Sequence, residues 1–269
     1  MASSDVAFSG SVPATYHDCL VPLLFAPYAD DLAVRAAADN PARILETAAG
    51  TGAVTAALLE RLPAARIVAT DLNQAMLDVA ARETDSDRVE FRQADAQALP
   101  FDDGSFDLVV TQFGVMFYPD RPLGYREALR VLTRGGQLLF NVWDSLAANP
   151  VSAIIAEEVA KAFPHDPPSF LSRVPFGYHD TDRIVRELTE AGFTAIETER
   201  VRKVSRVDPV SAAAGLCKGS PLLAEIEARD PARVGEVVDK VTAARIAWGG
   251  DAVFEAPMSA IVVTAHKPA

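Results

Sequence analysis

Three carboxylate side chains stand where apolar runs of the chain end: Glu46, Asp71 and Asp95. Gly50 and Gly52 follow the first of them in a short turn, and a run with helical periodicity begins directly after this turn. Because glycine has no Cβ, the backbone N–H groups of such a turn can approach a ligand closely. The first N–H groups of the helix behind the turn are unpaired and favour an anionic group. These residues predict a ligand site built from carboxylates and backbone N–H groups.

The elements that would position these residues alternate between strands and helices. Apolar runs predict strands over residues 43–46, 66–70, 89–93, 106–111 and 137–143. Apolar positions at i, i+3 and i+4 predict helices over residues 53–62, 74–83 and 123–132. This alternation is typical of βαβ units in a mostly parallel sheet, where ligands bind beyond the carboxyl ends of the strands. Glu46, Asp71 and Asp95 should therefore share one edge of that sheet.

The ends of the chain continue the pattern less regularly. The segment 16–38 predicts one or two short helices, because Pro22 and Pro27 interrupt its helical periodicity. Gly135-Gly136 predicts a turn directly before the strand at 137–143. The elements predicted after Asn149-Pro150 are helices over 151–163 and 182–191, a strand over 193–207, two helices between 209 and 248, and a last strand over 259–265.

The composition restricts the class of protein. The chain has 269 residues, 49% of them hydrophobic, and a net charge of −12, which argues against a nucleic-acid partner. Its two cysteines, Cys19 and Cys217, and its scattered histidines predict no disulfide framework and no metal site. The first ten residues lack the pattern of a secretory signal, and no run approaches the roughly 18 apolar residues of a membrane span. We therefore expect a cytoplasmic protein without a membrane span.

The two aspartates suggest what kind of ligand is bound. A carboxylate at the position of Asp71 can accept hydrogen bonds from both hydroxyls of a ribose. Asp95, at the end of the next predicted strand, can accept from the exocyclic amine of an adenine. Together they predict a site for an adenosine-containing ligand.

At this point the chain resembles the class I S-adenosylmethionine-dependent methyltransferases, in particular the small-molecule branch of the ubiquinone and menaquinone biosynthesis methyltransferases. The resemblance covers roughly residues 16–145. It rests on five ordered segments: ILETAAGTG at 44–52, DLNQAML at 71–77, ADAQALPF at 94–101, FDLV at 106–109 and VLTRGG at 131–136. The chain departs from the family at Ala48, where members usually have glycine.

The resemblance implies a fold, a domain organisation and a cofactor site. The implied fold is a Rossmann-like α/β sheet of seven mostly parallel strands with an antiparallel last strand between the fifth and sixth, helices on both faces and a helical cover over the active site. The implied parts are an N-terminal helical cover at 1–40, a cofactor-binding core at 41–150, and strands six and seven with substrate-side helices at 151–269. The cofactor would be S-adenosylmethionine, with S-adenosylhomocysteine as product. The residues implied to bind it are Tyr16, Glu46, Ala48, Gly50, Gly52, Asp71, Leu72, Met76, Asp95, Ala96, Gln112 and Phe113.

The expected reaction is in-line displacement of the sulfonium methyl group by a carbon, oxygen or nitrogen atom of a small, apolar or aromatic acceptor. A general base is needed only where the acceptor is poorly ionised. His17, Tyr118 and Asp120 are the candidates for that base by their position in the chain. The expected state of the protein is a monomer or a homodimer.

Simpler interpretations stand beside these. Asp71 and Asp95 can serve as turn caps, and Met76 can be a core residue. Ala48, Gly50 and Ala53 loosely fit the G-x-G-x-x-G/A pattern of NAD-dependent oxidoreductases. A protein that binds an adenosyl ligand without catalysis, as a scaffold, is a further alternative.

Overall fold

The computed structural model describes residues 3–6, 8 and 10–269, and the described chain divides into two compact units. The first unit consists of residues 1–27, 143–178 and 202–259. The second consists of residues 28–142, 179–201 and 260–269. Long strands pass from one unit to the other, so each unit is built from segments that lie far apart in the sequence.

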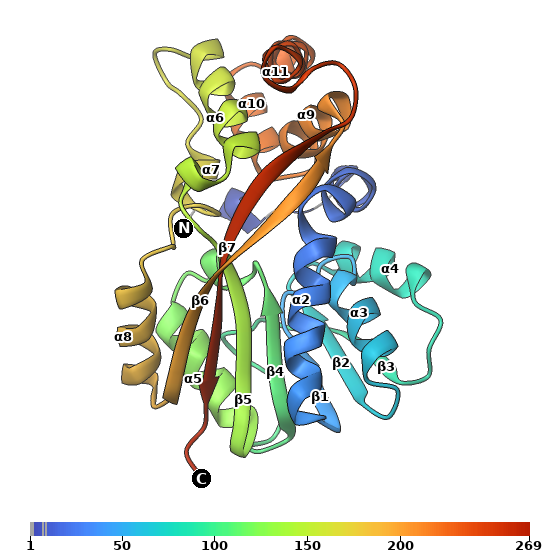
Figure 1. Cartoon of the computed structure of the whole chain (residues 1–269), viewed down its shortest axis with the longest axis vertical. Helices are drawn as coiled ribbons and strands as arrows, with labels where there is room; N and C mark the ends of the chain where they lie inside the picture. The colour runs from blue at the N-terminus through green and yellow to red at the C-terminus, as the bar shows by residue number, and fades with distance from the viewer. Residues whose placement is uncertain (1–2, 7, 9) are drawn as a thin grey trace. The chain divides into compact units, whose positions relative to one another are not determined.

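A seven-stranded sheet has the order β3-β2-β1-β4-β5-β7-β6, with β7 antiparallel to the other strands (Figure 1). This confirms the predicted sheet and the place of its last strand. The backbone N–H of Gly135 donates to the carbonyl of Lys267, and that of Asp144 donates to the carbonyl of Ser259, so β5 and β7 run in opposite directions. The strands are β1 (Arg43–Glu46), β2 (Arg66–Asp71), β3 (Val89–Gln93), β4 (Phe106–Gln112), β5 (Leu132–Trp143), β6 (Thr194–Val207) and β7 (Phe254–His266).

The central strands are buried on both faces, which explains their continuous apolar runs. In β1, Ile44 and Leu45 are fully buried, and the residues 108–110 of β4 are at most 1% exposed. By contrast, β3 forms an edge of the sheet and most of its side chains are exposed. This burial agrees with the strand order, in which β1 and β4 lie beside each other in the interior of the sheet.

Helices surround the sheet of the second unit. α4 contacts β2 and β3, and α5 packs against α8 (Figure 1). α2 carries Tyr28, Leu32 and Ala33, all of them fully buried. The helices of this unit are α2 (Ala26–Ala36), which begins in the first unit, α3 (Ala53–Arg61), α4 (Gln74–Glu83), α5 (Arg121–Val131), α8 (Thr181–Ala191) and the short turns η3 (Ala37–Asp39) and η4 (Val115–Phe117).

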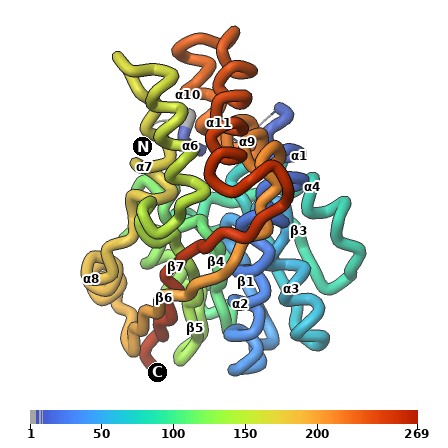
Figure 2. The backbone as a smooth tube through the Cα atoms, turned by 45° about the horizontal axis from the view of Figure 1, so that its top comes forward, coloured from blue at the N-terminus to red at the C-terminus, as the bar shows by residue number. Residues whose placement is uncertain are grey.

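The first unit is mostly helical. α11 contacts both α6 and α9, and η2 contacts α9 (Figure 2). Its elements are η1 (Ser3–Val6), α1 (Val12–Thr15), the π-helix η2 (Tyr16–Phe25), η5 (Leu146–Ala148), α6 (Pro150–Ala162), α7 (Phe170–Arg173), α9 (Pro209–Lys218), α10 (Leu222–Arg229), η6 (Pro231–Arg233) and α11 (Val234–Gly249). None of the helices among the described residues combines the length and the apolar character that crossing a membrane requires.

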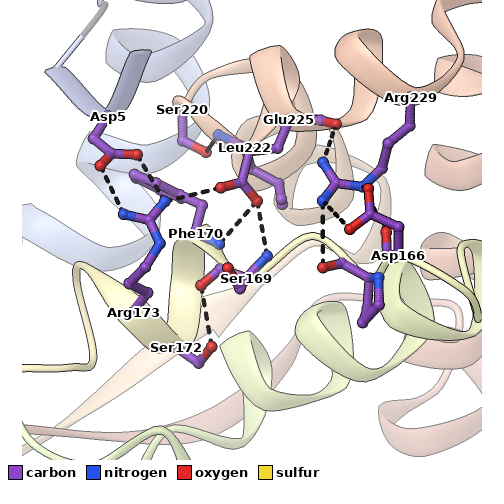
Figure 3. A network of polar contacts seen from close by, with 11 residues as sticks. Asp5, Asp166, Ser169, Phe170, Ser172, Arg173, Ser220, Leu222, Glu225 and Arg229 are labelled. Atoms are coloured by element: carbon purple, nitrogen blue, oxygen red, sulfur yellow. Dashed lines mark hydrogen bonds and ion pairs between the residues drawn. The ribbon is translucent and has the colours of Figure 1, made fainter. Parts of the chain in front are cut away.

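Polar side chains tie the N-terminal segment to the first unit. Arg173 donates to both oxygens of the buried Asp5, at 2.7 and 2.8 Å, and to Glu225 at 2.9 Å (Figure 3). The second oxygen of Glu225 accepts from the backbone N–H groups of Ser169 and Phe170. This network joins segments 168 and 52 positions away from Arg173 in the sequence.

Two predicted boundaries were wrong for identifiable reasons. Between residues 209 and 248 the structure has three α-helices instead of two, because Pro221 and Pro231 each interrupt the helical periodicity. β5 begins at Leu132 and not at Gln137, since Gly135-Gly136 forms an irregularity inside the strand. Opposite this irregularity, β4 advances by two residues while β5 advances by five, from Leu132 to Gln137.

The last strand was also predicted too short. β7 begins at Phe254, five residues before the predicted start at Ser259. Pro257 lies inside this first part of the strand, and a proline there obscures the strand pattern because it lacks the N–H donor of a sheet ladder.

Candidate functional site

The sequence-predicted residues of the second unit meet at the carboxyl ends of four neighbouring strands. In the order β3-β2-β1-β4, β1 lies between β2 and β4, and all three pairings are parallel. Glu46 is the last residue of β1, Asp71 the last of β2 and Gln112 the last of β4. Asp95 follows β3 by two residues. The parallel register therefore brings these side chains to one edge of the sheet.

The turn after β1 is held against the end of β2. Ala48, Gly50 and Gly52 all have positive φ angles, of 52°, 57° and 87°. The backbone N–H of Gly50 donates to Asp71 Oδ2 at 2.9 Å, and that of Ala49 donates to the carbonyl of Thr70 at 2.9 Å. A Cβ added at Gly52 would lie 3.1 Å from the Cβ of Ala80, so both conformation and space favour glycine there.

Asp71 is buried, with 8% of its surface exposed. Its Oδ1 accepts from the backbone N–H of Asn73 at 2.8 Å. Burial raises the pKa of Asp71, and the backbone N–H groups of Asn73 and Gly50 oppose that rise. The side-chain amide of Asn73 also donates to Oδ1, at 3.4 Å. Each carboxylate oxygen has two lone pairs, so Oδ2, which accepts from Gly50, is the oxygen that can accept a further hydrogen bond from a ligand.

Asp95 lies beside the end of β2 because the backbone N–H of Ala94 donates to the carbonyl of Asp71 at 3.0 Å. Its own carboxylate is exposed and accepts from the backbone N–H of Gln97 at 2.8 Å. Asp71 and Asp95 thus both cap turns, each through the N–H two residues further on. Capping and ligand binding do not exclude each other, since both contacts with Gln97 are made by Asp95 Oδ1 and leave its Oδ2 for a ligand.

Leu72 and Met76 differ in their exposure. Leu72, next to Asp71, is 46% exposed. Met76 lies on α4 with 3% exposed and belongs to the core. Ala96 is half-buried beside the exposed Asp95. At this edge Leu72 is the apolar side chain that is open to a flat ligand.

Glu46 is the most deeply buried carboxyl group of this edge. It is 1% exposed, and Thr55 Oγ1 donates to its Oε2 at 2.5 Å. Burial, together with the nearby charge of Asp71, raises the pKa of Glu46 to about 8. The group therefore changes its charge near neutral pH, a property that is more common at functional sites than elsewhere.

The end of β4 turns sharply at Phe113, which has a φ of 48°. Its backbone N–H donates to Asn141 Oδ1 at 2.9 Å, and its ring contacts the ring of Tyr28 edge to face at 5.4 Å. The next residue is Gly114, where an added Cβ would lie only 2.5 Å from the Cβ of Ala48. The turns after β1 and β4 thus touch at Ala48 and Gly114.

A polar cluster between β1 and β4 includes a residue that sequence reasoning missed. Thr47 Oγ1 lies 2.5 Å from Thr111 Oγ1 and 3.1 Å from the hydroxyl of Tyr118. Burial raises the pKa of Tyr118 to about 12, although the hydrogen bonds from the threonine side chains act in the opposite direction. Thr47 directly follows Glu46 at the end of β1, and Thr111 lies at the end of β4. Because β1 and β4 pair in parallel, these two side chains are expected to meet, and this pairing could have identified Thr47.

The other candidate bases have different surroundings. Asp120 caps α5, accepting from the backbone N–H of Leu123 at 2.9 Å. His17 has a buried Nδ1 that forms no hydrogen bond with any described residue. Tyr16 stacks on Phe25 at 4.9 Å between ring centroids. Tyr16 and His17 belong to the first unit, so their part in a site at the strand ends stays a prediction.

A surface cavity of about 290 Å³ lies at the opposite edge of the sheet, near the amino end of β4. Asp107, Gly136 and His266 are among its lining residues, and none of the residues predicted to bind the cofactor is. Ligands of such sheets bind beyond the carboxyl ends of the strands, so this cavity does not mark the candidate site. Among residues 3–6, 8 and 10–269, no group of three His, Cys, Asp or Glu side chains is arranged to hold a metal ion.

The comparison with known proteins agrees with this geometry. Residues 45–140 match the family model of the methyltransferase domain. Over 111 residues the chain is 42% identical to the demethylmenaquinone methyltransferase of Thermus thermophilus, a match that covers 40% of this chain and 49% of that protein. Over 166 residues it is 33% identical to the ubiquinone/menaquinone biosynthesis C-methyltransferase UbiE of Stenotrophomonas maltophilia, covering 56% of this chain and 65% of that protein.

A solved structure shares the fold over the whole chain. It is that of phosphoethanolamine N-methyltransferase 2 of Haemonchus contortus in complex with S-adenosyl-L-methionine, with a TM-score of 0.62, 16% identity, and coverage of 100% of this chain and 61% of that one. The present chain spans about half the length of the curated relatives it matches, such as the 49% of the Thermus protein. Residues 45–140 are therefore similar to a methyltransferase domain, and this part of the chain resembles the ubiquinone and menaquinone biosynthesis methyltransferases.

Proposed function

We propose that this protein moves a methyl group from S-adenosylmethionine to a small, apolar or aromatic molecule by in-line displacement. The observation that supports this most directly is the pairing of Asp71 with the turn after β1. Asp71 Oδ2 accepts from the N–H of Gly50 and has a second lone pair for a ligand. The matched methyltransferase domain contains both residues.

The residues present fit the adenosyl part of this cofactor. Asp71 Oδ2 can accept from a ribose hydroxyl, and the exposed side chain of Leu72 suits one face of an adenine. Asp95 and Ala96 would contact the adenine edge, with Met76 behind it in the core. The turn at Ala48, Gly50 and Gly52 would lie along the ligand.

The other end of the cofactor would lie between β1 and β4. Glu46, Gln112 and Phe113 would be nearest the methionine part, and Tyr16 is a further residue that we expect to contact the ligand. When bound, S-adenosylmethionine supplies a sulfonium methyl group that a nucleophile can displace. The protein then mainly orients the two reactants and excludes water, and orientation alone can contribute about 7–11 kcal/mol.

Base catalysis has weaker support. A general base would add roughly 10²–10⁴-fold to the rate where the acceptor must lose a proton. A pKa of about 12 keeps Tyr118 protonated at neutral pH, and Asp120 is engaged as a helix cap. His17 remains the third candidate, and its buried Nδ1 forms no hydrogen bond with any described residue.

The names of the relatives suggest the acceptor class. The Thermus and Stenotrophomonas proteins are named for menaquinone and ubiquinone biosynthesis. An acceptor with a quinol-like or phenolic ring is therefore the first class to test.

The protein would act in the cytoplasm, as a monomer or homodimer, without a nucleic-acid partner. Light scattering after size-exclusion chromatography measures the oligomeric state.

Binding and transfer should be measured separately. Calorimetry of the full chain with S-adenosylhomocysteine and with NADH should show binding of the first alone. Mass spectrometry should then detect methyl transfer to members of a panel of quinols, phenols and amines. Tighter binding of NADH would favour an oxidoreductase, whereas binding of S-adenosylhomocysteine without transfer across the panel would favour a scaffold.

A further inference from the structure

Arg245 on α11 is a charged side chain with none of its surface exposed. Its Nη1 donates to the carbonyl of Val151, at the start of α6, at 3.0 Å. Its Nε and Nη2 are also buried, and no described residue accepts a hydrogen bond from either of them. Buried polar groups are almost always hydrogen-bonded, so two unsatisfied donors on one buried side chain require an explanation.

The two unsatisfied nitrogens lie on the same edge of the guanidinium group. Nε–H and one N–H of Nη2 point in parallel, and this edge matches the two oxygens of a carboxylate. The chain uses the same edge elsewhere: Arg130 pairs it with Glu127 at 2.8 and 2.9 Å, and Arg233 pairs it with Glu236 at 3.0 and 3.1 Å.

The positive charge of Arg245 has no ion-pair partner among the described residues. Asp208 interacts with it electrostatically, but the carboxylate of Asp208 caps α9 by accepting from the backbone N–H of Ser211 at 2.7 Å. The buried Cys217 is also near, and desolvation raises its thiol pKa to about 12, so it carries no negative charge. Burial lowers the pKa of Arg245 only to about 10, which leaves it protonated at neutral pH.

Another arginine of the same unit shows the contrast. Arg173 is partly exposed, yet it is paired with both Asp5 and Glu225 (Figure 3). α11 packs against α6 and α9 (Figures 1 and 2). Arg245 of α11 donates to Val151 of α6 and interacts electrostatically with Cys217 of α9, and α9 also carries the small buried side chains of Ala212 and Ala213. A water molecule could accept hydrogen bonds there, but it would not compensate the charge, whereas an anion does both.

We propose that Arg245 is an anion-binding residue that receives the carboxylate group of a small ligand inside the α6–α9–α11 cluster. The carboxylate oxygens accept from Nε and Nη2, while Nη1 stays on the carbonyl of Val151. This proposal does not rest on the proposed methyl transfer, because all the residues it uses belong to the first unit.

Thermal unfolding of the full chain tests the proposal with acetate and benzoate as probes. Acetamide and benzamide are the neutral controls, and sodium chloride keeps the ionic strength constant. A ligand that binds only the folded state raises Tm by about 3–5 °C for each tenfold increase above its Kd. We expect this rise with at least one carboxylate and with neither amide. A Tm that responds to neither carboxylate, or that responds equally to chloride, would overturn the proposal.

Two substitutions locate the effect. Arg245→Met removes the charge but keeps the length of the side chain, and we expect its Tm in the absence of probe to be unchanged or raised, because burying an unpaired charge costs free energy. The carboxylate response should be lost in this variant. Arg233→Met is the matched control, because its edge is already paired with Glu236, and it should respond like the wild type. A response that persists in Arg245→Met contradicts the proposal.

A measurement on the unaltered protein covers the case in which Arg245→Met does not fold. Crystals grown with 4-bromobenzoate should show the anomalous signal of bromine within the α6–α9–α11 cluster. The signal at another place only, or no signal, would overturn the proposal. Calorimetry with S-adenosylhomocysteine on the same protein keeps this outcome distinct from any failure of the proposed methyl transfer.

Discussion

The carboxylate of Asp71 accepts a hydrogen bond from the backbone N–H of Gly50 at 2.9 Å, across 21 positions of the sequence. The end of β2 thereby fixes the turn that follows β1. The same side chain also holds the start of α4 through the N–H of Asn73. A substitution at Asp71 should therefore affect the fold of the turn and the binding of a ligand together.

Replacing Asp71 with asparagine should weaken the binding of S-adenosylhomocysteine by about 1–3 kcal/mol, or roughly 5- to 150-fold. The amide can accept with one atom only, so its NH₂ group opposes either the N–H of Gly50 or that of Asn73. The free energy of unfolding should fall as well. Calorimetry and urea denaturation measure the two effects.

The control is Asp87→Asn, because Asp87 is exposed and precedes the amino end of β3. It should leave both the affinity and the stability unchanged. An Asp71→Asn protein that binds S-adenosylhomocysteine with unaltered affinity would remove Asp71 from the cofactor site.

Glu46 should make the stability of the protein depend on pH. Its pKa of about 8 in the folded state lies above the ordinary value of 4.5, so the folded state binds the proton more tightly than the unfolded state. This contribution is fully present below about pH 4.5 and is lost as the pH rises to about 8. Glu46→Gln does not titrate, so its stability relative to the wild type should increase over this range, by an amount on the order of a few kcal/mol.

Urea denaturation between pH 4 and pH 9 measures this difference. Glu60→Gln, on the exposed face of α3, is the control and should follow the wild type at every pH. If the Glu46→Gln and wild-type curves stay parallel over the whole range, the buried carboxyl group does not titrate as its surroundings indicate.

The strand ends were predictable because hydrophobic periodicity is a local property of the sequence. The apolar runs before Glu46 and Asp71 fix two strands, and parallel pairing then brings their ends together. The interruption at Pro221 was missed because a short break in helical periodicity is a weak signal. The hydrogen bond between Asp71 and Gly50 and the burial of Arg245 depend on tertiary packing, which no local pattern encodes.

Ala48 and Gly114 should be energetically coupled. Gly114→Ala would place a Cβ 2.5 Å from that of Ala48 and 2.7 Å from Thr111 Cγ2, so we expect a loss of about 1–3 kcal/mol of stability. Ala48→Gly relieves the positive φ of 52° and should stabilise the protein by about 1 kcal/mol.

The double variant carries the specific prediction. With glycine at position 48, the closest contact of the Cβ introduced by Gly114→Ala is removed and only that with Thr111 remains. The cost of Gly114→Ala should therefore be smaller in the Ala48→Gly background, with a coupling of at least about 0.5 kcal/mol in urea denaturation. If the effects of the two substitutions on the free energy of unfolding are additive, positions 48 and 114 do not interact sterically.

Tyr118→Phe should separate a structural role of the hydroxyl from a role as base. Thr47 and Thr111 stay paired with each other at 2.5 Å after the hydroxyl is lost, so stability should fall by only about 0.5–1.5 kcal/mol. With a pKa of about 12, Tyr118 stays protonated below roughly pH 10, and the variant should keep the shape of the wild-type pH–rate profile for methyl transfer. Tyr125→Phe, which alters another buried tyrosine of the same unit, controls for the loss of a hydroxyl group. Loss of a titrating limb from the profile in Tyr118→Phe alone would instead identify Tyr118 as the base and would mean that ligand binding lowers its pKa.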